Sequence, residues 1–154
     1  MAIDRTELAK GWAETRRYLL SHHEPEAWDR CYAPEFRGRR VRLCARCLGI
    51  YPGILLGVIA ETLVQLPISH YLLVGLLPLP ALVDWTVTTY TDKAGHNSVR
   101  TTTGTLLGIG YGVGLVHVVG NGDLGVVAIG AVYACAAGAL LLRSKSASSP
   151  SKLL

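Results

Sequence analysis

The stretch LGIYPGILLGVIAETLVQL, residues 48–66, is apolar over almost its whole length and contains no basic residue. A helix needs about 20 such residues to cross the hydrocarbon core of a bilayer. Further runs of the same kind follow it at residues 71–90, 104–120 and 124–142. The sequence therefore predicts four membrane-spanning helices.

The composition of the 154-residue chain agrees with a membrane protein. Half of the residues are hydrophobic, 17% are charged and the mean hydropathy is +0.33, whereas an average soluble domain has about 25% charged residues. These values argue against a disordered chain, a coiled coil and an ordinary soluble enzyme. The first thirty residues are charged throughout, so we expect no cleaved signal peptide.

Short connections join the apolar runs in pairs. Residues 65–70 carry Pro67, and the tripeptide Asn121-Gly122-Asp123 has the chemistry of a tight turn. Tight turns join antiparallel neighbours, so the four helices should form two hairpins. The expected fold class is all-α: a polytopic membrane protein with four transmembrane helices in two hairpins, preceded by an amphipathic helix.

The basic residues predict the orientation. All 15 Lys and Arg fall on one side of the membrane if both termini lie on that side: Arg5, Lys10, Arg16, Arg17, Arg30, Arg37, Arg39, Arg40, Arg42, Arg46, Lys93, Arg100, Arg143, Lys145 and Lys152. Basic residues accumulate in cytoplasmic loops. We therefore expect a multi-pass protein of the cell membrane whose two termini are cytoplasmic.

Residues 4–20 are expected to form a separate helix. Asp4 can cap it, with Glu7 three residues later. Its apolar residues fall near one face: Leu8, Trp12 and Leu19. We interpret it as a helix lying on the inner membrane surface, attracted to anionic headgroups. Nucleic acid is not expected as a partner, because topology already explains the arginines and the sequence has no recognition fold.

These patterns divide the chain into three parts. Residues 1–47 form a cytoplasmic segment with the amphipathic helix and a Cys/His region, residues 48–142 form the membrane domain, and residues 143–154 form a Ser- and Lys-rich tail that we expect to be disordered.

Small residues repeat at every fourth position on three of the four spans. The stripes are Gly49, Gly53 and Gly57; Gly104, Gly108 and Gly112; and Gly130, Ala134 and Gly138. Such stripes let helix backbones approach closely in lipid. Packing within one bundle is favoured over a dimer face, and an oligomer formed through these faces stays open. The second span instead carries Pro78 and Pro80, which predict a kink.

Residues 21–47 carry the residues best suited to chemistry. Cys44 and Cys47 form a C-x-x-C pair, and thiolate and imidazole are the ligands that tetrahedral zinc prefers. A zinc site formed by His23, Cys31, Cys44 and Cys47 is one hypothesis. A second is that these cysteines only pack at the start of the first span. A third is redox activity, since flanking arginines lower thiol pKa values. Cys135 is expected to be a small packing residue.

Two blocks of this sequence resemble a known family. The first is His22-His23-x-Pro25 followed by Cys44-Ala45-Arg46-Cys47-x-Gly49-Ile50-Tyr51-x-Gly53, and the second is Pro80, Asp84, Asn97, Arg100, Thr103, Gly104 and Gly108. Together they cover roughly residues 20–112 and are similar to the signature of the predicted membrane proteins known as domain of unknown function 2085. The resemblance implies a membrane topology and candidate positions, and it implies no activity.

The chain departs from the family pattern at three positions. Many members have a cysteine where Ser21 stands, Cys31 lies outside the common pattern, and Trp85 follows Asp84 where glycine is usual. The first two departures concern the metal ligands. A cysteine at position 31 in place of position 21 is compatible with the same site.

Ionisable residues inside a span are candidates for function because their burial in lipid is costly. Asp84 is expected at the cytoplasmic ends of the helices, with Arg46 or Arg100 as its counterion and Asn97 nearby. At the opposite ends, three further ionisable residues are expected to gather or to extend toward the interface: Glu61, His70 and His117.

Three functional hypotheses follow. The leading one is a polar pocket at the cytoplasmic face, formed by Arg46, Asp84, Asn97 and Arg100, which binds an amphipathic molecule with an anionic head such as a phospholipid or an isoprenoid phosphate. If the protein is an enzyme, Asp84 is the candidate base and a bound metal the electrophile. The second is an oligomeric transporter or proton-coupled carrier that uses Glu61 and Asp84. The third is an assembly protein whose cysteine segment docks a cytoplasmic partner.

Overall fold

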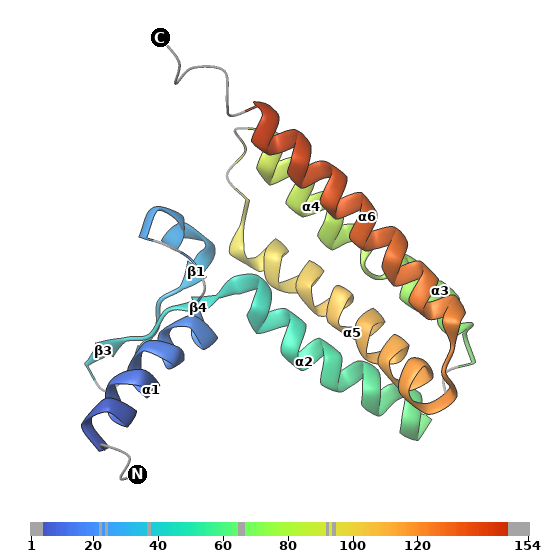
Figure 1. The fold of residues 1–154 in the computed structure, drawn as a ribbon, viewed down its shortest axis with the longest axis horizontal. Coiled ribbons are helices and arrows are strands. Elements are labelled where there is room, and N and C mark those ends of the chain that lie inside the picture. The colour runs from blue at the N-terminus through green and yellow to red at the C-terminus, as the bar shows by residue number, and fades with distance from the viewer. Residues whose placement is uncertain are drawn as a thin grey trace.

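The computed structural model describes residues 5–21, 23, 25–36, 38–64, 67–91, 93 and 95–147. Within them, four helical segments are long and apolar enough to cross a membrane, which confirms the predicted fold class. The helices are α1 (Arg5–Leu20), η1 (Pro25–Arg30), α2 (Ala45–Ile59), η2 (Ala60–Val64), α3 (His70–Leu76), α4 (Leu79–Tyr90), α5 (Asn97–Asn121) and α6 (Leu124–Ala147). Successive spans run in opposite directions (Figure 1).

The two ends of the bundle differ in what they carry. We define the segment end as the end at which α2 and α5 begin, next to residues 21–44. The turn end is the opposite one, where residues 67–69 lead into α3 and residues 122–123 join α5 to α6.

Two helix boundaries differ from those expected from the apolar runs. Helix α5 begins at Asn97 instead of residue 104, and α6 continues to Ala147 instead of ending at residue 142. The apolar run marks only the part of a helix that lies in lipid, and these helices extend beyond it into more polar sequence. Residues 148–154 of the expected tail lie outside the described part of the chain.

Helices α2 and α5 are packed backbone to backbone along two of the glycine stripes. A Cβ atom added to Gly53 would lie 2.5 Å from the Thr105 carbonyl oxygen, and one added to Gly108 would lie 2.3 Å from that of Ile50. Glycine at these positions therefore permits an approach that no other residue allows. The stripes serve packing within one chain, as the sequence favoured.

The second span is broken where proline was expected to kink it. Helix α3 ends at Leu76 and α4 starts at Leu79, with Pro78 between them. The Pro78 carbonyl accepts hydrogen bonds from the amides of Ala81 and Leu82 at 3.1 and 3.2 Å. The phenol of Tyr133 donates to the carbonyl of Gly75 in the last turn of α3. A side chain from α6 thus satisfies a carbonyl near the break.

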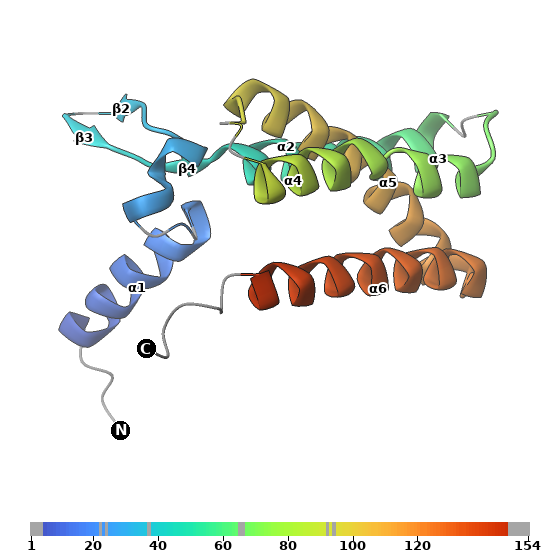
Figure 2. The same ribbon diagram turned by 90° about the horizontal axis from the view of Figure 1, so that it is seen from above.

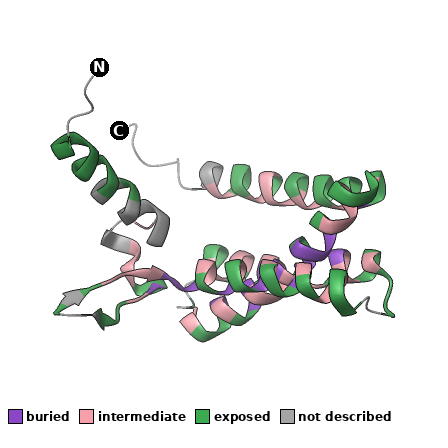
Figure 3. Cartoon of the chain, turned by 90° about the horizontal axis from the view of Figure 1, so that it is seen from below, coloured by how far each residue is buried: buried purple, intermediate pink, exposed green. Residues whose placement is uncertain are grey.

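Of the four membrane-spanning segments, α6 has the sparsest contacts with the others (Figure 2). The small buried core is formed where it meets α3 and α5, by Val74, Val113 and Val126. A Cβ atom on Gly130 or Gly138 would meet nothing within 4 Å, so the third small stripe is not packed against a helix. Exposed residues occur along all the spans (Figure 3), and many of them are large apolar residues, which suits a surface covered by lipid tails.

Residues 31–44 form a hairpin, an addition to the all-α fold expected from the sequence. Strands β1 (Cys31–Tyr32) and β4 (Leu43–Cys44) pair antiparallel, and β2 (Glu35–Phe36) pairs with β3 (Arg39–Arg40) beyond them. Gly38 at the tip has a φ of 73°, which glycine adopts without strain.

Helix α1 precedes this hairpin and stands away from the bundle (Figure 1). Leu8 and Trp12 are 63% and 66% exposed, as expected for side chains that a membrane surface would cover. Asp4, the expected cap, lies outside the described residues, as does the side chain of Leu19.

Candidate functional site

An ion pair between Arg46 and Asp84 lies at the segment end, between the first turn of α2 and the middle of α4. The Nη2 atom of Arg46 donates to Oδ2 of Asp84. The Asp84 side chain is 8% exposed and that of Arg46 is 24% exposed. The sequence left Arg46 and Arg100 open as partners of Asp84, and the structure assigns Arg46.

Arg46 keeps one donor unused while it binds Asp84. Its Nε atom is buried and has no hydrogen-bond partner among the described residues. A guanidinium carries five N–H donors, and a buried donor without an acceptor destabilises the protein. The Arg46–Asp84 pair therefore leaves part of the hydrogen-bonding capacity of Arg46 unused.

Arg100 is buried close by, in the first turn of α5. It is 5% exposed, and its Nη1 atom donates to Oδ1 of Asn97 at 3.1 Å. A Cβ atom on Gly95 would lie 3.0 Å from Nη2 of Arg100 and 2.7 Å from Cγ2 of Thr88. Arg100 thus reaches the end of α4, one turn from Asp84. With two arginines and one carboxylate, this group carries net positive charge.

Asn97 also attaches the N-terminal segment to the bundle. Its Nδ2 atom donates to the carbonyl oxygens of Asp29 at 3.0 Å and Cys31 at 3.4 Å. The Tyr32 hydroxyl lies 3.1 Å from the Thr101 hydroxyl, which donates to the Ala45 carbonyl at 2.9 Å. Asn97 therefore holds the cysteine segment in place and orients Arg100, and its amide nitrogen is already engaged.

A cavity of about 760 Å³ lies between α3, α4, α5 and α6. Its walls are apolar side chains and glycine backbone, and Arg46 is the one charged residue among the described residues that line it. Trp85 and Leu141 line it toward the segment end, and Val118 and Val126 toward the turn end. Its volume lies within the range of small-molecule sites in proteins, roughly 300–1,000 Å³.

The four residues predicted to bind zinc lie near one another at the start of α2. Cys31 and Cys44 face each other across β1 and β4. Nε2 of His23 lies 3.3 Å from Sγ of Cys44, and the Cys44 side chain hydrogen-bonds Cys47. The Ser21 hydroxyl lies 3.3 Å from Sγ of Cys31. The structure thus brings Ser21 next to Cys31.

These four residues do not meet the spacing of a compact ligand set. Among the described residues, the group of three His, Cys, Asp or Glu donor atoms that all lie within 4.8 Å of one another is at the turn end instead. The cysteines are free thiols, with Cys31 and Cys44 buried. The zinc site therefore stays a prediction, as do the redox and packing alternatives.

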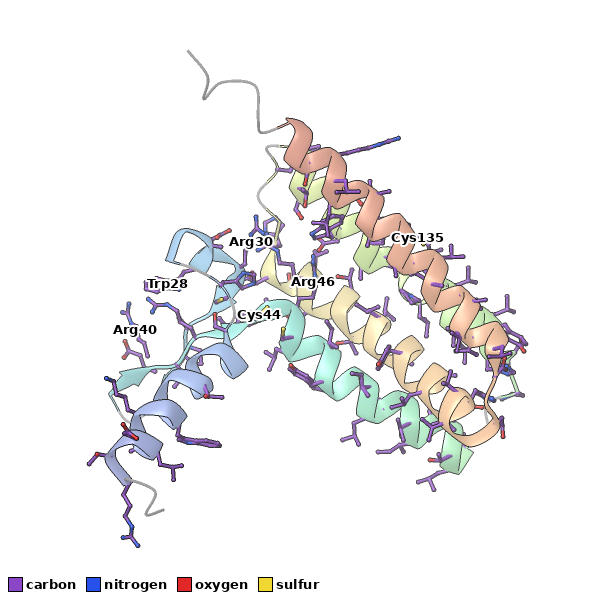
Figure 4. All side chains as sticks on the ribbon, in the orientation of Figure 1. Trp28, Arg30, Arg40, Cys44, Arg46 and Cys135 are labelled. Atoms are coloured by element: carbon purple, nitrogen blue, oxygen red, sulfur yellow. The ribbon has the colours of Figure 1, made fainter. Side chains whose placement is uncertain are left out.

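Two other residues of the cysteine hypotheses are separate from the thiols. The Cζ atom of Arg42 lies 3.2 Å from the centroid of the Trp28 ring, a cation–π contact. Cys135 is exposed on α6, away from Cys44 at the start of α2 (Figure 4).

A second polar group occupies the turn end. Nε2 of His117 lies 2.8 Å from Oε1 of Glu61, and Nε2 of His70 lies 3.1 Å from Oδ2 of Asp123. The two imidazole rings are stacked, with centroids 3.8 Å apart and an interplanar angle of 16°. The sequence left open whether Glu61, His70 and His117 gather here or extend toward the interface, and it missed the contribution of Asp123.

Asp123 also begins α6. Its Oδ1 atom accepts hydrogen bonds from the amides of Gly125 at 2.8 Å and Val126 at 3.3 Å, and the Tyr71 phenol donates to both carboxylate oxygens. Desolvation raises the pKa of Asp123, but the hydrogen bonds from Tyr71, Val126, Gly125 and His70 outweigh it and lower this pKa below its ordinary value.

Comparison with known proteins places these residues in a family. The sequence profile of the family described as "Predicted membrane protein (DUF2085)" matches residues 30–113, more than half of the chain. The chain belongs to this family. The matched region of the DUF2085 protein includes β1 through most of α5 and ends before α6. It contains Arg46, Asp84, Asn97 and Arg100, whereas His23 and His117 lie outside it.

The DUF2085 chain is also similar to an uncharacterized protein of Methanocaldococcus jannaschii. The two are 32% identical over 77 residues, which are 46% of this chain and 48% of the relative. The chain thus aligns with about half the length of the curated relative it matches. No solved structure matches the DUF2085 chain.

Several residues of the two polar groups were not predicted from the sequence. Tyr32, Trp28 and Thr101 fix the cysteine segment through contacts between residues up to 69 positions apart. The sequence marks Asp123 as a turn residue. Its second role is indicated only by its position, just before a membrane span that follows two helices containing histidine.

Proposed function

We propose that this membrane protein binds an amphipathic lipid whose apolar chain lies in the cavity and whose anionic headgroup contacts Arg46. The observation that carries the proposal is the position of Arg46 at the segment end of an otherwise apolar cavity, with a buried and unpartnered Nε donor. An isoprenoid phosphate and a phospholipid share this chemistry.

The charges at the segment end support an anionic ligand. Asp84 neutralises Arg46, and Arg100 adds a further positive charge close to α4. By the distribution of Lys and Arg, this end lies at the cytoplasmic surface, at the depth of the headgroups. An Arg side chain there binds phosphate oxygens with charge-assisted hydrogen bonds.

The chain offers a matched pair of variants to test the cavity. A Cβ atom on Gly130 or Gly138 meets nothing within 4 Å, yet only Gly130 lines the cavity. We expect Gly130→Leu to reduce the binding of a polyisoprenyl phosphate to the detergent-purified protein at least about tenfold, and Gly138→Leu to leave it unchanged. Equal binding by both variants would remove the cavity from the proposal.

A second comparison tests the headgroup and identifies the ligand class. We expect Arg46→Gln to weaken the polyisoprenyl phosphate and to have no effect on the corresponding uncharged alcohol. Anionic phospholipid titrated in the same way distinguishes the two sources of phosphate. Glu61→Gln should leave lipid binding intact, whereas a carrier that uses Glu61 and Asp84 requires both carboxylates for flux.

We also propose that the cysteine segment binds zinc through His23, Cys31, Cys44 and Cys47. The cross-strand pairing of Cys31 with Cys44 and the short distance from Cys44 to His23 support it. Metal analysis should find zinc in the wild type and in Cys135→Ser, and less of it in the Cys44→Ser, Cys47→Ser variant. Equal zinc in all three proteins would rule out these ligands.

A further inference from the structure

The polar group at the turn end contains side-chain atoms that can bind a metal ion. They come from residues in or next to the two helix connections at that end. His70 is the first residue of α3, His117 lies in the last turns of α5, and Asp123 lies between α5 and α6. One donor atom from each of these residues lies within 4.8 Å of the others. Three chain segments therefore direct side chains to one point.

Glu61 lies beside these three residues, although its carboxylate is not among the donor atoms that all lie within 4.8 Å of one another. Its Oε1 atom is 2.8 Å from Nε2 of His117, while its Oε2 atom is buried and has no hydrogen-bond partner among the described residues. A buried carboxylate oxygen without a donor is costly. It implies that something other than the described side chains satisfies this oxygen when the site is in use.

The chemistry of the donors indicates which ligand that is. Two imidazoles and two carboxylates are the nitrogen and oxygen ligands of first-row divalent metal ions such as Zn²⁺. Each imidazole already faces a carboxylate oxygen, at 3.1 Å for His70 and Asp123 and at 2.8 Å for His117 and Glu61. In each pair a bound cation would replace this direct contact between the ring nitrogen and the carboxylate oxygen.

The surrounding groups fit such a site as well. The Tyr71 phenol donates to Asp123, and the Asn121 amide lies 3.4 Å from Nδ1 of His117. Hydrogen bonds of this kind orient metal ligands. The four side chains are between 15% and 26% exposed, so an ion can enter from the aqueous side while most of each ligand is held in place.

We propose that His70, His117 and Asp123, with Glu61 beside them, form a binding site for a divalent transition-metal ion at the turn end. The site faces the compartment opposite the termini. It is independent of the zinc hypothesis for the cysteine segment, because the two sets of ligands lie at opposite ends of the spans.

Titration of the detergent-purified chain with Zn²⁺ tests this site. We expect His70→Gln together with His117→Gln to remove one equivalent of bound Zn²⁺ or to weaken its binding at least about tenfold. The matched control is His96→Gln, because His96 is an exposed histidine at the segment end, and its binding should equal that of the wild type. Wild-type binding by the double variant would overturn the proposal.

Two further measurements test the metal site even if the double variant folds poorly. Asp123→Asn retains an oxygen for the amides of Gly125 and Val126 but removes a charged ligand, so it should weaken Zn²⁺ and leave the fold intact. Co²⁺ bound to the Cys44→Ser, Cys47→Ser variant should give ligand-field bands without thiolate charge transfer. Their absence would contradict the site even if the cysteine segment binds zinc.

Discussion

The Arg46–Asp84 pair illustrates what single residues could and could not reveal. The sequence identified both as candidates, because charged residues near a span are rarely without a partner. Helix adjacency did not decide between Arg46 and Arg100, because α4 packs against α5, which carries Arg100, yet Asp84 pairs with Arg46 from α2. That choice needs three-dimensional packing, and it leaves Arg100 bonded to Asn97 instead.

Gly108 gives the sharpest prediction at this scale. We expect Gly108→Ala to lower the free energy of unfolding in detergent by about 1–3 kcal/mol, because its Cβ would lie 2.3 Å from the backbone oxygen of Ile50 and cannot be accommodated without moving α2. Thermal or chemical denaturation of the purified protein measures this change.

Gly130→Ala is the control for that substitution. Its Cβ would enter open space, and alanine favours a helix over glycine by about 1 kcal/mol. We therefore expect it to be neutral or stabilising. A loss of stability equal to that of Gly108→Ala would contradict the packing of α2 against α5.

At the scale of elements, hydropathy predicted the positions of the spans correctly, but it did not predict which helices pack together. The four apolar runs match the four long helices, and the prolines mark the break between α3 and α4. Three similar small stripes gave no means to decide which two would pack together. The strands at residues 31–44 are two residues long, too short for an alternating pattern to indicate them.

The start of α6 depends on a carboxylate whose pKa is lowered, and this has a consequence for stability. Asp123 is more acidic in the folded protein than its ordinary pKa of 3.8, so the folded state favours the charged form more than the unfolded chain does. Its contribution to stability is complete above that pKa and is lost as the pH falls through the lower value of the folded state.

Comparison with Asp123→Asn isolates this effect from other titrating groups. We expect the wild type to be the more stable of the two at neutral pH, and the difference between their melting temperatures to shrink as the pH falls below 3.8. Melting curves in detergent over that pH range provide the measurement. A difference that does not change with pH would contradict the role of the charge.

For the whole molecule, the distribution of Lys and Arg and the alternating directions of the spans agree on which residues lie at each end of the bundle. The described Lys and Arg residues of the segment and of the connection between α4 and α5 lie at the segment end, and the turn end carries His70 and Asp123 instead. The sequence could place polar groups at two ends in this way. It could not foresee the cavity, which depends on the distance between α6 and its neighbours.

Reporter fusions test this arrangement in cells. A reporter inserted after Gly122 should be active only outside the cytoplasm, and one attached after the last residue, Leu154, should be active only inside it. Reporters of both kinds at each site provide the internal control. The same location for both sites would reverse or exclude the four-span topology.

The backbone contact between α2 and α5 has a mechanical consequence. Carbonyl and glycine atoms in direct contact leave few side chains at this contact that can change rotamer, so we expect these two helices to move as one stiff block. Deformation is then concentrated in the other half, where Pro78 interrupts one helix and α6 touches its neighbours sparsely. A lipid that entered the cavity from the bilayer would therefore meet a rigid wall on one side and a more deformable one on the other, and we expect α6 to be the helix that moves to admit it.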